Sequence, residues 1–270
     1  QIPLTEEQSL RLRALERGTN DPLIDAIFDD SERMIRAVQA RIELARGDAL
    51  VDGIVTIAEN DMFVTIDYGM PANHKVTAGV AWTQANAASA TPISDLLGWI
   101  ETYVDTVGAP PRGIMMSRRR LPGLLVNQEV RNFAASGGTT PQRVNLATVQ
   151  DIFSDQGLPP ITAPTGADPI NSGPFFDEVV RVNGQQVRVI PDNVVIFLPP
   201  ANERMGETFY GLTAEATRLV ERRLITAQDA PGIVALALQN DNPVQTFTLA
   251  TAIALPVIPN AQLMFTATVA

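Results

Sequence analysis

The chain has 270 residues, no cysteine, one histidine and a formal net charge of −10. The missing cysteines exclude disulfides and thiolate chemistry, and a single histidine argues against a zinc or non-haem iron site. The balance of 30 acidic to 20 basic residues argues against general nucleic-acid binding, which needs a basic surface. Only 19% of the residues are charged, so we expect partners to cover much of the surface.

The N-terminal part predicts two helices followed by a hairpin. A short amphipathic helix is expected over residues 4–17, and a much longer one over residues 21–50. Pro22 suits the first position of the long helix, whose acidic residues come early and whose arginines come late, as the helix dipole favours. Alternating residues then predict strands at 54–58 and 62–68, joined by a turn at 59–61.

The rest of the chain mixes helices and strands. Thr213 is expected to cap a helix that ends near Leu224, and Asn183-Gly184 is the favoured pair for a two-residue hairpin turn. The other expected helices lie at 92–107, 121–135 and 145–156, and the other expected strands at 114–116, 194–198, 233–238, 244–255 and 263–269, with a hairpin over 175–190. This order predicts an α+β fold in which the late strands return to the first set.

No group of residues predicts catalysis. A Ser-His-Asp site would have to use His74, which we interpret as an exposed or hydrogen-bonded loop residue. Asp25 and Asp29 share a helix face and resemble a carboxylate site, but acidic residues are common in the first half of a helix. We therefore expect no catalytic residue, no cofactor and no metal. The uncharged run 242–270 contains three prolines and is interpreted as strands, not as a membrane span.

Two groups of residues are candidates for contacts between subunits. Arg118, Arg119 and Arg120 form the strongest basic run, and no aromatic residues interleave them as in proteins that bind single strands. Salt bridges to neighbouring subunits are therefore favoured over a DNA contact. Trp82 and Trp99 are interpreted as core or interface anchors.

Several segments of the chain form a series of landmarks. The long helix comes first, followed by Pro71-Ala72-Asn73-His74, and then by Trp99 in its helix. The other landmarks are the segments 49–69, 190–193, 206–213, 241–244 and 254–260. In this order they resemble the major capsid protein E family of tailed bacteriophages, the lambda-like coat proteins with the Hong Kong 97-type fold.

The resemblance implies a shell protein with two domains. Residues 1–89 and 232–270 would form the peripheral domain, with residues 21–50 as its spine helix, and residues 90–231 the axial domain. The protein would assemble as hexamers and pentamers into an icosahedral head around double-stranded DNA, with no sequence-specific contact to the DNA. The resemblance also implies scaffolding, portal and decoration proteins as partners, and no contact with a membrane. It places the protein in the virion and, during assembly, in the host cytoplasm.

Other interpretations stay open at this point. They are an encapsulin-type compartment shell, a head–tail connector, and a hydrolase that uses His74 or the pair Asp25 and Asp29. Members of the family carry an N-terminal arm and an extended loop before the spine helix, so we expect those segments to precede Gln1 in the intact protein. Some relatives cross-link through lysine, and because Lys75 is the only lysine we assign no cross-link.

Overall fold

The computed structural model describes residues 2–4, 22–59, 62–136, 138–162, 174–182, 184–222, 231–241 and 244–270. The chain divides into a smaller unit, residues 1–43, 181–185 and 208–256, and a larger unit, residues 44–180, 186–207 and 257–270. These boundaries differ from those of the peripheral and axial domains, whose assignment stays a prediction.

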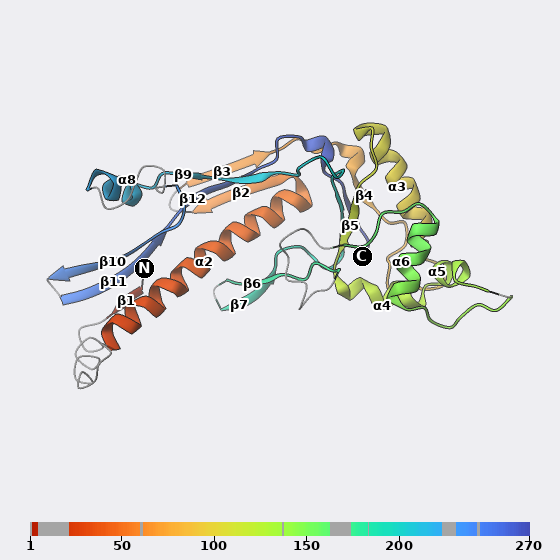
Figure 1. Cartoon of the computed structure of the whole chain (residues 1–270), viewed down its shortest axis with the longest axis horizontal. Helices are drawn as coiled ribbons and strands as arrows, with labels where there is room; N and C mark the ends of the chain where they lie inside the picture. The colour runs from red at the N-terminus through yellow and green to blue at the C-terminus, as the bar shows by residue number, and fades with distance from the viewer. Residues whose placement is uncertain are drawn as a thin grey trace. The chain divides into compact units, whose positions relative to one another are not determined.

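The long helix is present as α2 (Pro22–Asp52) and begins at the expected proline (Figure 1). Its burial increases toward the C-terminal end, where Ala45 and Ala49 pack in a cluster with Val55 and Met70. Gly53 ends the helix with a φ of 68°, in the left-handed region that favours glycine. On the exposed side, Arg36 pairs with Glu32, as the i,i+4 spacing predicts.

The smaller unit is built around an antiparallel sheet with the strand order β1-β11-β10. Its strands are β1 (Ile2–Leu4), β10 (Val234–Asp241) and β11 (Val244–Thr251), and the last two form a long ribbon (Figure 1). The strand expected over 244–255 is divided, because β11 ends at Thr251 and a new strand, β12 (Ile253–Val257), pairs with β9 (Glu207–Gly211). The helix expected over 4–17 lies outside the described residues, apart from Leu4 at the end of β1.

Thr213 caps α8 (Ala214–Glu221) as expected, because its hydroxyl oxygen accepts a hydrogen bond from the backbone N–H of Ala216 at 3.1 Å.

The larger unit has a four-stranded sheet with the order β4-β13-β8-β5. Its strands are β4 (Lys75–Thr77), β5 (Gly113–Met116), β8 (Val194–Leu198) and β13 (Thr266–Thr268). β13 is parallel to β4 and antiparallel to β8, and β8 is antiparallel to β5. Every residue of β5 and β8 is buried, which explains why both strands are continuous apolar runs.

Two hairpins have the predicted positions. β2 (Ile54–Glu59) pairs with β3 (Met62–Asp67), and β6 (Val179–Val182) pairs with β7 (Gln185–Arg188). Three short 3₁₀ segments, η1 (Ala72–His74), η2 (Arg118–Arg120) and η3 (Ala261–Leu263), complete the connections.

Helices α3 (Pro92–Val107) and α6 (Leu146–Asp155) match the sequence prediction, but the helix expected over 121–135 is broken. It consists of α4 (Leu121–Val126) and α5 (Gln128–Phe133), separated at Asn127, whose ψ of 136° is not helical. The Asn127 side chain accepts from the N–H of Val130 and donates to the carbonyl of Ala90 at 2.8 Å. Asparagine breaks the helix here because it satisfies these backbone groups itself.

Glu129 of α5 caps the start of α3 from a distance in sequence. Its carboxylate accepts from the backbone N–H of Ile93 at 2.7 Å and from that of Ser94 at 3.1 Å. Because Thr91 makes no side-chain cap, the negative charge of Glu129 satisfies the first free N–H groups of α3 and complements its dipole.

An aromatic cluster fills the core of the larger unit. Phe197 of β8 stacks on Phe265 at a centroid distance of 4.5 Å, and Tyr103 of α3 meets both rings edge-on. The Tyr103 hydroxyl donates to the carbonyl of Leu263 at 3.2 Å. Burial, together with a smaller contribution from the charge of Glu203, raises the pKa of Tyr103 to about 12.

His74 belongs to this core, so of the two expected alternatives, exposed or hydrogen-bonded, the hydrogen-bonded one is present and the ring is not exposed. The side chain has 0% of its surface exposed and lies between Tyr103 and Phe265, with centroid distances of 5.6 and 5.3 Å. Its Nδ1 is 2.7 Å from the carbonyl of Met264, so the expected hydrogen bond is present. Nε2 has no hydrogen-bond partner among the described residues.

We predict that Phe265→Ala lowers the free energy of unfolding by about 3–5 kcal/mol, because it opens a cavity beside Phe197. Phe63→Ala is the matched control, since Phe63 is 75% exposed, and should change stability by less than about 0.5 kcal/mol. Urea unfolding followed by tryptophan fluorescence measures both. Equal effects of the two substitutions would show that the aromatic cluster is not the core.

We predict that the larger unit loses stability as the pH falls below about 6.5. Burial lowers the pKa of His74 from 6.5, although the backbone carbonyls of Met264 and Gln262 raise it. The unfolded chain therefore takes up the proton first, and stability falls by at most about 1.4 kcal/mol per pH unit between the two pKa values.

His74→Asn is the matched variant for this test, because asparagine can donate to Met264 and does not titrate. Since His74 is the only histidine, urea unfolding between about pH 7 and about pH 5 should depend less on pH in the variant. Identical slopes in the two proteins would contradict the assignment.

Candidate subunit-contact residues

The three consecutive arginines form η2 directly after the buried strand β5. The Ser117 hydroxyl oxygen accepts from the backbone N–H of Arg119 and fixes the start of this turn. Arg119 pairs with Asp192 at 3.2 Å, and Arg120 approaches the same carboxylate at 3.8 Å. Two of the three arginines that are candidates for subunit contacts therefore have an acidic partner within their own subunit.

Arg118 differs from the other two arginines. Its side chain is exposed, and no ion pair joins it to another described residue. Its backbone N–H donates to Asp177 at 3.0 Å, which holds the backbone in place while the guanidinium stays at the surface. Of the three, Arg118 has the charge most available to another molecule.

Asp177 organises this surface, and no pattern in the sequence singles it out. Its carboxylate accepts from the Ser117 hydroxyl at 2.6 Å and pairs with Arg188 at 2.7 Å. Burial raises the pKa of Asp177. The hydrogen bonds from Ser117, from Arg188 and from the backbone of Arg118 lower it, as does the charge of Arg188. These contributions together outweigh burial, so the pKa of Asp177 lies below its usual value. Asp177 is therefore an anion that joins η2 to β7.

The two tryptophans are neighbours in the larger unit. Trp82 is only 2% exposed, stacks on Trp99 at a centroid distance of 5.5 Å and donates its Nε1–H to Asp95 at 2.9 Å. Gly123 lets the backbone of α4 approach, because a Cβ at that position would lie 2.6 Å from the carbonyl oxygen of Trp82. Trp82 therefore serves the core and leaves little surface for a partner, whereas Trp99 is half-buried.

The acidic candidates do not form a metal site among the described residues. Asp29 lies exposed on α2, and the side chain of Asp25 lies outside the described residues. No three histidine, aspartate or glutamate side chains in the described part of the chain come together in a way that could hold a metal ion.

Exposed apolar side chains were not identified from the sequence. Phe63 is the most exposed of the large apolar residues described, and Phe209, Leu212 and Ile253 are each more than half exposed. The sequence held one usable sign, because Phe63 alternates with Thr65 and Asp67 on the polar side of its strand. Exposed apolar side chains that lie together mark contact surfaces, whereas single ones are common on any protein.

Comparison with known proteins adds family and fold. The family model of the phage major capsid protein E matches residues 1–269. No curated protein matches the chain at a significant level. Of the helices in the described ranges, none combines the length and apolar character needed to cross a membrane.

Solved structures resemble the chain at low sequence identity. A prophage protein of Escherichia coli CFT073, described as a capsid protein, is 15% identical, with a TM-score of 0.62 over 94% of this chain and 71% of that one. A phage-related protein of Bordetella bronchiseptica RB50 is 12% identical, with a TM-score of 0.46 over 84% and 61%. The SrpI encapsulin of Synechococcus elongatus PCC 7942 is 9% identical, with a TM-score of 0.40 over 96% and 69%.

The similarity to the Escherichia coli prophage protein confirms the α+β capsid fold expected from the sequence, and the other two similarities are too weak to add to it. The family assignment rests on the match to nearly every residue of the chain. The chain belongs to the phage major capsid protein E family, and its role in the phage capsid is structural.

Proposed function

We propose that copies of this protein associate as hexamers and pentamers and form the icosahedral head that encloses double-stranded phage DNA. The family match over residues 1–269 carries this proposal. The net charge of −10 supports it, because an acidic wall repels packaged phosphates and does not retain them. Contact with the DNA would then involve no reading of base sequence.

The proposal includes the partners and places that such a head requires. Scaffolding, portal and decoration proteins are its proposed partners, and the host cytoplasm is the proposed place of assembly before the subunit becomes part of the virion. Residues 1–89 with 232–270 would act as the peripheral domain and residues 90–231 as the axial domain.

No residue is proposed to be catalytic. The burial of His74 supports this, because a ring without exposed surface cannot contact a substrate.

Electron microscopy of the purified protein tests the proposed function. Closed isometric particles are the expected result, because the same contacts repeat around each symmetry axis. Rings without closed particles would instead identify a connector, and a monodisperse monomer at high protein concentration would contradict a shell-forming role.

Arg118 is the residue of the arginine run that we propose to reach an acidic group of a neighbouring subunit. A single exposed ion pair contributes at most about 1 kcal/mol, but symmetry repeats it at every copy of the contact. Arg118→Glu should therefore lower the yield of particles several-fold while the melting temperature of the subunit stays unchanged.

Arg143→Glu is the matched control, because Arg143 is also an exposed arginine of the larger unit. Particle yield is measured by sedimentation, and subunit stability by thermal unfolding. If both substitutions lower the yield equally, the effect belongs to net charge and not to Arg118.

A further inference from the structure

One pocket of the larger unit combines an apolar floor with two arginines. Its volume is about 490 Å³, within the range in which proteins bind ligands or anchor side chains. The pocket is lined by apolar side chains from three elements, Leu50 of α2, Met115 of β5 and Leu198 of β8. Phe176, before β6, and Ile190, before β8, complete this apolar lining.

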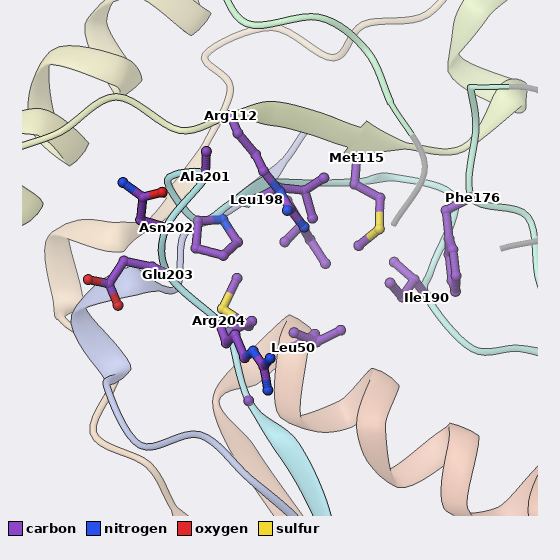
Figure 2. Close-up of a pocket in the computed structure, with 14 residues that line it drawn as sticks. Leu50, Arg112, Met115, Phe176, Ile190, Leu198, Ala201, Asn202, Glu203 and Arg204 are labelled. Carbon is purple, nitrogen blue, oxygen red and sulfur yellow. The ribbon is translucent and has the colours of Figure 1, made fainter. Parts of the chain in front are cut away.

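The two arginines give the pocket a positive edge. Figure 2 shows the guanidinium of Arg112 reaching across Leu198 toward the middle of the pocket, and that of Arg204 lying beside Leu50. The carboxylate of Glu203 also belongs to the lining but points away from both guanidinium groups (Figure 2). Both arginines are exposed, and no ion pair joins either one to another described residue. The pocket therefore suits an apolar side chain that has negative charge beside it.

Phe63 of β3 is an apolar side chain of this kind. The register pairs Ile57 with Val64 and Val55 with Ile66. Val55 is fully buried, so this face of the hairpin packs inward at its base, while Val64 nearer the turn is 39% exposed. Phe63 lies on the opposite face, paired with Ala58, and is 75% exposed. It cannot turn inward without shifting the register of the hairpin.

The charges near Phe63 are opposite to those of the pocket. In the sequence Asp61 stands two positions before Phe63, and no lysine or arginine occurs between positions 47 and 74. An aromatic residue that enters an apolar pocket commonly carries most of the energy of an interface, and complementary charges at its edge select the partner.

We propose that Phe63 of the β2–β3 hairpin of one copy enters the pocket between Arg112 and Arg204 of a second copy. This inference rests on the proposed shell function. The contact joins two different surfaces of the same chain, so each copy can give its hairpin to one neighbour and receive that of another. Contacts of this type propagate from subunit to subunit and close into rings or shells.

Cysteine pairs test the contact directly, because the natural chain has no cysteine. Ala58 is exposed and is paired with Phe63, and Ala201 is exposed and lines the pocket. The double variant Ala58→Cys with Ala201→Cys keeps Phe63 and should form disulfides between copies in assembled particles. A disulfide requires Cα atoms within about 7 Å. The expected result is a ladder of covalent oligomers on a non-reducing gel that collapses to monomer on reduction.

The control pairs Ala58→Cys with Phe133→Cys, since Phe133 is exposed but does not line the pocket. This variant and each single cysteine variant should stay monomeric on the same gel. Particles of the Ala58→Cys, Ala201→Cys variant that show no cross-link would overturn the inference and leave the shell function intact. A natural chain that forms no particles would instead refute the proposed function.

A charge exchange gives a second, independent result. Arg204→Glu should lower particle yield about tenfold, which corresponds to about 1.4 kcal/mol for the contact, whereas Arg204→Lys should keep most of the yield. Adding Asp61→Arg to the Arg204→Glu chain should restore particles, because the charges are then complementary again. Failure of this combination to recover any yield, with normal subunit melting, would show that the hairpin does not meet Arg204.

Discussion

The structure of the larger unit depends on the placement of β13 between β4 and β8. Thr266 is paired with Lys75 on one side and with Ile196 on the other, so three segments that are far apart in sequence meet in one sheet. Thr266 also donates its hydroxyl hydrogen to the carbonyl of Leu50 near the end of α2. The backbone N–H groups of Ala78 and Trp82 donate to Thr268 and Val269, which extends the connection to the loop before α3.

The aromatic core follows from this placement. The residues just before β13 offer their carbonyl groups to the core, where Leu263 accepts from Tyr103 and Met264 from His74. Phe265 brings its ring against Phe197 of the neighbouring strand. Because a hydrogen bond to a buried carbonyl is costly to lose, each of these polar contacts fixes an otherwise apolar core in one arrangement. The arginines of η2 then follow directly after β5, a strand that is buried in this core at every position.

Local sequence signals predicted the elements whose causes are local. The proline at the start of α2, the cap at Thr213 and the turn pair at residues 183–184 all act within a few positions, and the corresponding elements are present. The break at Asn127 was not predicted, because the apolar pattern continues through it and the deciding hydrogen bond goes to Ala90. In the same way, no pattern could show that Glu129 caps α3 or that the chain buries its only histidine.

The contacts of the candidate residues with other subunits stay a prediction, and the sequence could not show which of their charges pair within the subunit. A run of three arginines shows where charge accumulates, but Asp192, which pairs with two of them, lies more than seventy positions away in the sequence.

The position of β13 also determines when the sheet can form during synthesis. The strand that completes the sheet follows β4, β5 and β8 in the chain, so the ribosome makes the middle of the sheet after its other strands. The core cannot close until residues 266–268 have been made, and until then the edges of β4 and β8 that β13 joins have no partner in this sheet.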